Sequence, residues 1–424
     1  MQNFFRKLTV VFTDKDIRNR LLVIIGALAL FRMLAAIPIP GVNRELLASF
    51  FDNNQFLNLI DMFSGGGLAN LSIVMLGVGP FITASIIMQL MTVMSPRIKS
   101  LYSEEGEAGR AKFTQYSRLL TLPLAVLQGF GFLTLLKSNG VLFEMSSFEF
   151  IVNVVLVTAG SMLLMWIGEL ITEFGIGNGV SIIIFAGIVA SLPSALTGFD
   201  STELPMYLGF GAVALLIIYA VVIVTEAERP VPITYSKQSR GGVTYGGSSS
   251  YLPLRLNQAG VIPIIFALSI LLFPQMLLNI LSSLKIYTSW DLSWVDGANE
   301  AITNLMNNQL AYGASYFVLV FLFTYFYTAV TFDPEQVAKN LQQSGAYVPG
   351  IRPGTNTAEY LGNLITRLTF VGALFLGAVA VLPVVLQYVT GNTSLIVGGT
   401  AVLIVVQVIL DLIRRMDAQV SLRE

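Results

Sequence analysis

Apolar residues run along this chain in long blocks, separated by short polar stretches and by two long polar loops. The blocks are roughly twenty residues long, the length of helix that crosses the hydrocarbon core of a bilayer. A transmembrane barrel would instead show alternating segments of about ten residues. The pattern therefore predicts an all-α polytopic membrane protein with ten transmembrane helices. They are expected at residues 21–38, 73–95, 117–137, 149–170, 179–196, 206–227, 259–281, 312–332, 361–388 and 395–413.

The most informative stretch runs from Phe56 to Met94. A short amphipathic piece ends at Phe63, the sequence Ser64-Gly65-Gly66-Gly67 follows, and a long apolar segment comes next. Each glycine costs about 1 kcal/mol relative to alanine inside a helix, so the helix should break here. Irregular backbone at membrane depth is tolerated only where it is buried in protein or lines a wet cavity. We therefore expect this stretch to line a pore and, as a mobile plug, to block it; a plain extracytoplasmic loop is the alternative.

Composition agrees with a membrane protein and narrows its chemistry. The chain is 54% hydrophobic and 12% charged, with a mean hydropathy of +0.74, whereas soluble domains carry about 25% charged residues. It has neither cysteine nor histidine. This excludes thiolate and Ser–His–Asp catalysis and any zinc site built on Cys or His. Carboxylate-only chemistry remains open, but we expect no enzyme activity, no cofactor and no metal site.

The distribution of the 24 Lys and Arg residues predicts the orientation. Most lie in the two tails and in the loops after the second, sixth and eighth expected helices, so the positive-inside rule places both termini in the cytoplasm. Residues 1–20 are expected to form an amphipathic segment on the cytoplasmic surface, and residues 414–424 a cytoplasmic tail. Residues 21–200 and 201–413 would each hold five helices, and five-helix halves are compatible with an inverted repeat.

Two cytoplasmic loops, 228–257 and 333–360, are too long to be simple connections. The first alternates in polarity between glycines, which suggests a projecting β-hairpin. The second is rich in Pro and Gly around Arg352, so its backbone should be well defined. Long ordered basic loops suit docking of a large cytosolic partner; a solvated loop that merely obeys the positive-inside rule is the alternative.

Isoleucines on helices that also bear small and polar residues are candidates for a constriction. A ring of such side chains would exclude water and ions by dewetting without binding a substrate specifically. Charge within the expected spans is scarce, which argues against an ion-coupled transporter and for a passive conduit. Arg32 is the clearest charged residue inside a span, and the sequence assigns it no function. The candidate isoleucines are Ile82, Ile86, Ile184, Ile188, Ile262, Ile265 and Ile404.

Five stretches, in order along nearly the whole chain, closely resemble the SecY family, the large channel subunits of the bacterial Sec protein translocase. The third and fourth of these are long enough that chance does not explain them. The stretches are 62–66 (MFSGG), 175–188 (GIGNG through IIIFAGI), 252–263 (LPLRLNQAGVIP), 345–354 (GAYVPGIRPG) and 398–400 (GGT).

The resemblance implies two inverted five-helix halves around an hourglass pore, closed from outside by a plug at residues 57–70. It implies a lateral gate between the second and seventh helices, through which signal sequences and membrane helices reach lipid. The implied pore-ring residues are Ile82, Ile86, Ile188, Ile265 and Ile404, with Ile262 and Ile264 as neighbouring candidates in the seventh helix. The implied plug residues are Met62, Phe63, Ser64, Gly65, Gly66, Gly67 and Leu68.

The resemblance also implies partners and a location. The chain would pass unfolded secretory polypeptides across the bacterial cytoplasmic (inner) membrane, with SecE and SecG as partner subunits. The motor ATPase SecA or the translating ribosome would drive transport by docking on the loops around Lys237, Arg240, Arg255 and Arg352. Both a single heterotrimer and a homodimer of heterotrimers are compatible with the sequence.

Two other classes of function remain as alternatives. A secondary transporter would share the broken helix and the repeat, but it needs convergent polar groups at the midplane. An intramembrane enzyme would need an Asp pair or a Ser–Lys dyad within the spans, and neither is evident. Solute uptake by liposomes that contain the protein alone would favour the transporter, whereas motor- or ribosome-dependent chain movement would favour the channel.

Overall fold

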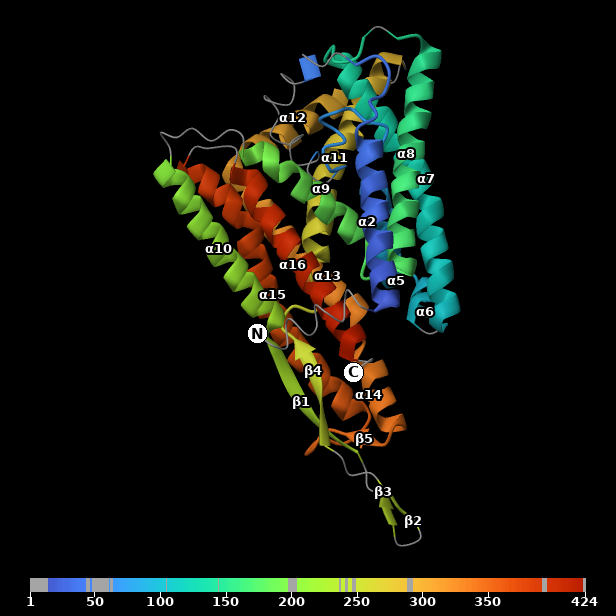
Figure 1. Cartoon of the computed structure of the whole chain (residues 1–424), viewed down its shortest axis with the longest axis vertical. Coiled ribbons are helices and arrows are strands. Elements are labelled where there is room, and N and C mark those ends of the chain that lie inside the picture. Colours follow the sequence, from blue (N-terminus) through green and yellow to red (C-terminus); the bar gives the residue numbers. More distant parts are fainter. Residues whose placement is uncertain are drawn as a thin grey trace.

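Helices make up most of the computed structural model, with a small β-structure projecting from one end (Figure 1). The structure describes residues 14–42, 46–47, 61, 64–103, 105–143, 145–196, 204–235, 238–240, 243–245, 249–287, 293–390 and 395–421. The helices in these ranges are α2 (Lys15–Ala35), α5 (Gly79–Met94), α6 (Pro96–Ser103), α7 (Gly106–Ser138), α8 (Ser147–Phe174), α9 (Gly179–Leu196), α10 (Leu204–Glu226), α11 (Ile262–Tyr287), α12 (Ser293–Asn307), α13 (Gln309–Thr331), α14 (Pro334–Gln343), α15 (Thr355–Thr390) and α16 (Leu395–Ser421).

Each of the ten expected spans overlaps one of these helices, but only some of the overlapping helices combine, within the described residues, the length and the apolarity of a membrane-spanning helix. Within the described residues, α7, α8, α13 and α15 meet the length and apolarity of a membrane-spanning helix. The bent pair α5–α6, with 115° between its parts, would add a fifth. Charged residues at both ends of α2 (Arg18, Arg20 and Arg32) reduce its apolarity. The arrangement of ten spans in two inverted halves therefore stays a prediction.

The expected start of the second span at residue 73 was wrong. Helix α5 begins at Gly79, with Pro80 in its first turn, where the missing proline N–H has no helical partner to lose. The preceding residues form turns, and the Ile73 amide donates to the Ile37 carbonyl at 3.0 Å instead. Gly77 takes a positive φ of 57°, a conformation that glycine adopts without steric cost. Apolar composition thus continues through a segment whose backbone hydrogen bonds are not helical.

Helix α2 begins earlier than its expected span. Asp14 caps it: the Asp14 Oδ1 atom accepts hydrogen bonds from the amides of Asp16 at 2.8 Å and Ile17 at 3.1 Å. A side-chain oxygen at this position satisfies amides that the first turn leaves unpaired. Residues 15–20, expected in a separate surface segment, therefore belong to the first long helix. The rest of that segment, residues 1–13, lies outside the described residues.

The expected hairpin in the loop 228–257 is confirmed, and it is part of a larger sheet. Strand β1 (Glu228–Tyr235) pairs antiparallel with β4 (Ser249–Arg255), and β2 (Gln238–Arg240) pairs with β3 (Val243–Tyr245) further out along the hairpin (Figure 1). Strand β1 also pairs with β5 (Ala346–Tyr347) from the second loop, in the order β4-β1-β5. The two long loops, 228–257 and 333–360, are therefore one structural unit.

The second loop holds a helix that the sequence analysis did not expect. Asp333 caps α14 through hydrogen bonds from the amides of Glu335 at 3.0 Å and Gln336 at 3.2 Å, with Pro334 in the first turn. A small apolar cluster joins α14, α15 and the sheet. Its buried members are Val231, Leu254, Val348, Leu361 and Ile365.

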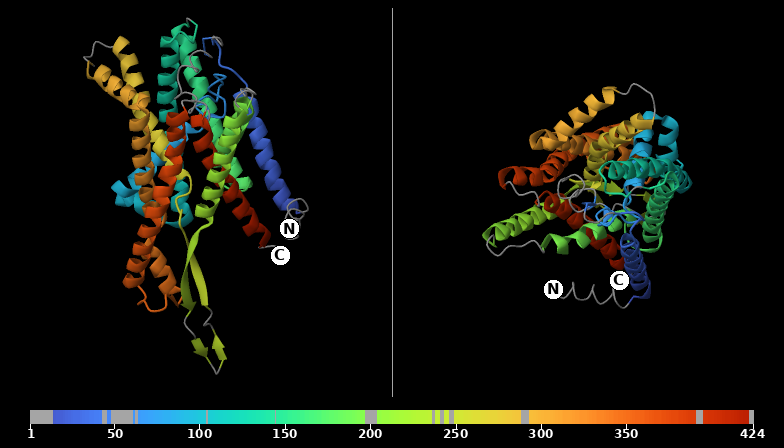
Figure 2. Two further views of the ribbon diagram at one scale, coloured as in Figure 1. Left: turned by 90° about the vertical axis from the view of Figure 1, so that its left-hand side faces the viewer. Right: turned by 90° about the horizontal axis from the view of Figure 1, so that it is seen from above.

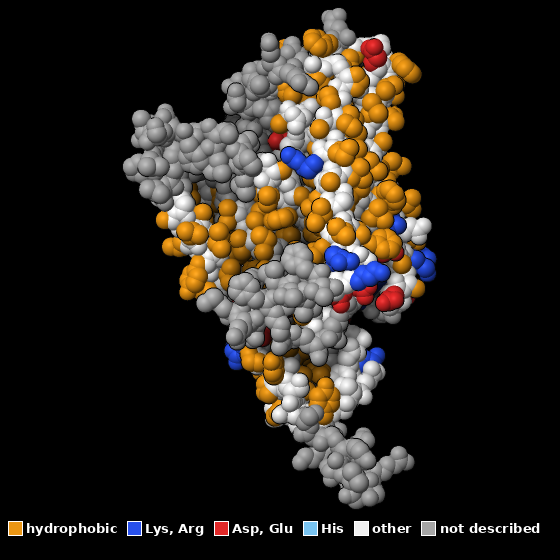
Figure 3. Space-filling view, in the orientation of Figure 1, with side chains coloured by type: hydrophobic (Ala, Val, Ile, Leu, Met, Phe, Trp, Pro, Cys, Tyr) orange, Lys and Arg blue, Asp and Glu red, His pale blue; other side chains and the backbone are white. Residues whose placement is uncertain are grey.

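The largest apolar cluster lies at the centre of the helical body and draws on helices from α2 to α16. Seen from above, the helices surround a central region (Figure 2). A second cluster, confined to the N-terminal part, joins the segment 68–75 to α7 and α8. In Figure 3, hydrophobic side chains cover most of the outer face over α7 and α8, while most of the visible Lys and Arg side chains lie toward the hairpin end. This distribution agrees with a cytoplasmic hairpin.

Candidate functional site

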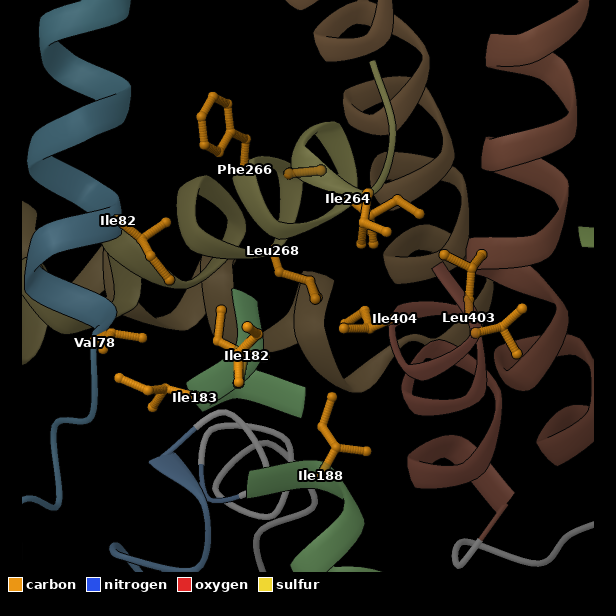
Figure 4. Packing of buried hydrophobic residues seen from close by; sticks show 14 of the residues in the cluster. Val78, Ile82, Ile182, Ile183, Ile188, Ile264, Phe266, Leu268, Leu403 and Ile404 are labelled. Atoms are coloured by element: carbon orange, nitrogen blue, oxygen red, sulfur yellow. The ribbon is translucent and has the colours of Figure 1, made fainter. Parts of the chain in front are cut away.

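Four of the five expected pore-ring isoleucines come together in the central cluster. Ile82 and Ile86 on α5, Ile188 on α9 and Ile404 on α16 are at most 8% exposed, although they come from distant parts of the chain. Figure 4 shows Ile404 and Ile188 pointing toward a common centre together with Leu268 of α11. Aliphatic side chains from three helices that converge in this way can form a constriction.

The contribution of α11 is broader than the sequence analysis expected. Ile264 is fully buried, whereas Ile262 and Ile265 line a cavity that Ile404 also lines. Ile262 and Ile265 are therefore both placed to serve as a pore-ring residue, whereas Ile264 does not line this cavity. Leu268 follows at the same three-residue spacing and points toward Ile404 (Figure 4). The spacing Ile262, Ile265, Leu268, which places all three on one helix face, is the signal that could have identified Leu268.

The cavity, of about 250 Å³, lies between the start of α9, the β4–α11 connection and α16. Its aliphatic lining includes Ile182, Ile184, Ile262, Ile265 and Ile404, and its polar lining includes Asn178, Ser181, Arg255, Gln258, Gln407, Asp411, Arg414 and Arg415. The cavity is thus polar toward the hairpin base and aliphatic toward the constriction. Such a combination favours water on the polar side and disfavours it on the aliphatic side.

Two of the arginines that line this cavity make ion pairs, Arg414 with a residue of α10 and Arg415 with a residue of its own helix, α16. Arg414 Nη2 donates to the Thr225 carbonyl oxygen and to Glu226 Oε1, each at 2.8 Å, which ties α16 to α10. Arg415 Nε donates to Asp411 Oδ2 at 2.9 Å, one turn earlier on α16. Charge-assisted hydrogen bonds of this kind are shorter and stronger than neutral ones. These contacts fix the shape of the polar side of the cavity.

The plug residues that the structure describes form a compact turn. Gly65 and Gly66 have φ values of +74° and +79°, a conformation that glycine adopts without steric cost, and the Gly66 amide donates to the Asp61 carbonyl oxygen at 3.0 Å. The Ser64 hydroxyl accepts a hydrogen bond from the Leu68 amide at 3.0 Å. Leu68 is fully buried in the cluster with α7 and α8. Met62 and Phe63, and the plug residues before Asp61, lie outside the described residues.

Two residues that the sequence gave no individual role contact the glycine turn: Asp61, which lies inside the expected plug range 57–70, and Arg32 on α2. Asp61 Oδ1 accepts hydrogen bonds from the Ala69 amide at 2.7 Å and from the Ser64 hydroxyl at 3.3 Å. Arg32 Nη1 donates to the Gly65 carbonyl oxygen at 2.8 Å. A lone charged residue in an otherwise apolar stretch is the signal that could have singled out each of them, but only the fold shows that Arg32 lies at Gly65.

The helices expected to form the lateral gate are neighbours. Helix α5 packs against α11, and α11 also packs against α7. Gln128 Nε2 of α7 donates to Thr83 Oγ1 of α5 at 3.5 Å, beside the isoleucines. The contact between α5 and α11 places a boundary between the two parts of the chain next to the constriction.

The four basic residues expected to dock a partner are spread over the cytoplasmic unit. Arg255 lines the cavity at the base of the hairpin, and Arg352 is exposed in the loop that precedes α15. Arg240 lies on β2, far out along the hairpin, and Lys237 lies outside the described residues. Arg255 is therefore better placed to face the pore, and Arg352 to face a docked partner. In the part of the chain that the structure describes, no group of three acidic, His or Cys residues could hold a metal ion.

Comparisons with known proteins agree with this geometry. A family model described as SecY matches residues 72–413. A curated relative from Mycobacterium bovis, named protein translocase subunit SecY, is 41% identical over 96% of both chains.

Solved structures share the fold. A structure described as showing that the plug domain of the SecY protein stabilises the closed state of the translocation channel matches with a TM-score of 0.67 and 17% identity, covering 96% of this chain and 93% of that one. Sec61 in the canine ribosome–channel complex from the endoplasmic reticulum matches with a TM-score of 0.63, 17% identity and the same coverage. The chain is thus a multi-pass membrane protein, and it belongs to the SecY family.

Proposed function

We propose that the chain forms a protein-conducting channel that passes unfolded secretory polypeptides across the bacterial cytoplasmic (inner) membrane. The observation that carries this proposal is the buried convergence of Ile82, Ile86, Ile188 and Ile404 between a polar cavity and a plug. The name of the Mycobacterium bovis relative, a protein translocase subunit, supports it.

The constriction suits a substrate of varied sequence. Aliphatic side chains exclude water and ions by dewetting, yet they offer no hydrogen bond that would hold a passing chain. Short contacts of each isoleucine with its neighbours can be exchanged for contacts with a translocating chain at little cost, because dispersion attraction is non-directional. The plug would seal the channel when no chain is present.

The same architecture supports lateral release. Separation of α5 from α11 would open the constriction sideways, so that signal sequences and transmembrane helices reach lipid. These helices make few polar contacts with each other in the described residues: Thr83 of α5 instead bonds Gln128 of α7. An apolar boundary can part without leaving buried hydrogen-bonding groups unpaired.

The partners proposed are the subunits SecE and SecG, the motor ATPase SecA and the ribosome, with a homodimer of heterotrimers as a further assembly. The three-stranded sheet, Arg240, Lys237 and Arg352 would form the docking unit for the motor or the ribosome. The canine Sec61 structure, described as a ribosome–channel complex, supports docking of a ribosome. A driving partner is needed because the sequence carries no nucleotide-binding motif.

A disulfide crosslink tests the proposal directly, because the chain has no cysteine of its own. One variant is Ile86→Cys, and its control is Ile151→Cys on the outer face of α8, where the side chain is 60% exposed. A secretory chain that carries one cysteine is stalled during export. We expect a disulfide with position 86 that depends on a functional signal sequence. Crosslinking at 151 but not at 86 would contradict a pore through the isoleucines.

A further inference from the structure

The glycine turn of the expected plug contacts α2. Arg32 Nη1 donates to the Gly65 carbonyl oxygen, and the fully buried Phe31 ring lies against the same glycine. A Cβ atom at Gly65 would overlap the tip of the Phe31 ring and would come within 3.0 Å of Gly187 Cα on α9. Gly65 is therefore enclosed by Phe31, Arg32 and Gly187, and we call these three residues the plug seat.

The neighbouring glycine shows that this fit is specific to one position. Gly65 and Gly66 both have positive φ values, so both disfavour a side chain for the same backbone reason. A Cβ atom at Gly66, however, would meet nothing within 4 Å. The pair thus separates the cost of backbone conformation from the cost of losing the seat.

The plug seat adjoins the constriction. Gly187 directly precedes Ile188, and Phe31 belongs to the same buried cluster as Ile82 and Ile188. At the other end of α2, Arg20 Nη1 donates to the Gly175 carbonyl oxygen at 3.2 Å, close to the Gly177 that lines the polar cavity. With about 1.5 Å of rise per residue, the two contacts are roughly 18 Å apart along α2. One helix therefore touches the plug at one end and the cavity mouth at the other.

We propose that Arg32 is a positioning residue for the plug: its hydrogen bond to Gly65, on the surface shaped by Phe31 and Gly187, sets how readily the plug leaves the constriction. Arg32 is otherwise exposed and fills no core space, so its replacement leaves the packing of the cluster intact. A hydrogen bond from a charged donor is about twice as strong as a neutral one. This proposal rests on the proposed function, since a plug matters only in a channel.

Hydrogen–deuterium exchange of residues 64–72 measures plug opening in the intact protein, reconstituted in nanodiscs with its copurifying partner subunits. Protection is expected at the amides of Leu68, which donates to Ser64, and Ser72, which donates to the Gly67 carbonyl at 2.7 Å. We expect Arg32→Met to raise the exchange rate about tenfold, from the loss of one charge-assisted hydrogen bond. Arg32→Lys, which keeps a charge and donors, should restore most of the protection.

Two matched controls decide between a plug seat and a general effect on α2. Arg20→Met removes the same kind of arginine–carbonyl contact at the far end of the helix and should leave exchange at 64–72 unchanged. Gly65→Ala should raise exchange far more than Gly66→Ala. The proposal would be overturned if Arg32→Met left the exchange rate of the original protein unchanged. It would also be overturned if Arg20→Met raised exchange as much as Arg32→Met, or if Gly65→Ala and Gly66→Ala had equal effects.

The same preparations keep this proposal separate from the proposed function. If exchange follows the expected order but no secretory chain crosslinks to Ile86→Cys, the plug seat stands and the channel function fails. If crosslinking succeeds while exchange is insensitive to Arg32, the channel function stands and the plug seat fails.

Discussion

Asp61 and Ala69 are joined across the plug glycines: the Asp61 Oδ1 atom accepts a hydrogen bond from the Ala69 amide at 2.7 Å. Burial raises the pKa of the Asp61 carboxyl above its ordinary value of 3.8, and hydrogen bonds from Ala69, Ser64 and Leu68 offset part of that rise. The carboxyl therefore closes the plug turn while its own charge is disfavoured there.

This conflict predicts that plug closure depends on pH. A raised pKa in the closed plug means that the closed arrangement gains stability from protonation. That stability is fully present below 3.8 and is lost as pH rises through the higher value of the closed state. We expect amide exchange at 64–72, corrected for intrinsic rates, to slow as pH is lowered. Asp61→Asn keeps the acceptor and removes the charge, so amide exchange at 64–72 in this variant should be slow and independent of pH. A retained pH dependence would show that Asp61 is not the titrating group.

The isoleucine constriction predicts an ion leak when it is widened. Ile86→Gly on α5 removes a nearly fully buried side chain that faces the centre of the cluster. Ile151→Gly on α8 is the control, since both changes cost about 1 kcal/mol in helix propensity or less. In planar bilayers, Ile86→Gly should conduct ions in the resting state and accept defective signal sequences, whereas the control should not. Equal conductance of the two variants would argue against the constriction.

The close packing around Gly160 of α8 predicts that one added methyl group there destabilises the fold. A Cβ atom at Gly160 would overlap the Ile73 carbonyl oxygen, and the backbone there cannot yield without moving the plug connection. Gly26 on α2 has open space around it and is also inside a helix. Gly160→Ala should therefore lower the free energy of unfolding by about 1–3 kcal/mol, the cost of overpacking, and so lower the melting temperature. Gly26→Ala should raise the free energy of unfolding slightly, by about 0.5–1 kcal/mol, because alanine has the higher helix propensity. A neutral Gly160→Ala would mean that this contact is loose.

The exposed Arg352 predicts a variant that affects the two proposed driving partners, the motor and the ribosome, differently. Arg352→Glu reverses a charge on a loop whose backbone is held by the Thr357 hydroxyl, which donates to the Arg352 carbonyl at 2.9 Å. Because the backbone contact is kept, the fold should persist while a contact with the motor is lost. We expect motor-driven secretion to fall and ribosome-driven membrane insertion to continue. An equal loss of both activities would show that Arg352 does not distinguish the partners.

Local patterns predicted most of the helices because hydropathy and length are properties of contiguous sequence. They failed where backbone pairing overrode composition, as at Ile73, whose amide bonds Ile37 instead of continuing a helix. They also missed α14, which is short and polar and depends on the Asp333 cap.

The functional site shows the same limit. The individual isoleucines were identified, but the pairing of Arg32 with Gly65 and of Thr234 with Tyr347 joins residues that no local pattern relates. Leu268 was overlooked because leucines are common on lipid-facing surfaces, and only the fold shows that it faces Ile404 (Figure 4). Long-range contacts of this kind carry the parts of the mechanism that the sequence does not show.

The sheet that unites the two cytoplasmic loops has a mechanical consequence. Strand β1 continues from α10, and its partner β5 leads into α15, so a load applied to the outer hairpin is divided between these two helices. The apolar cluster around Val231 and Leu361 joins the sheet to α15, so a displacement of the outer hairpin would be transmitted to the helices through this cluster. A partner that docked on the outer hairpin and displaced it would therefore move α10 and α15 together, so that docking and helix movement would be coupled.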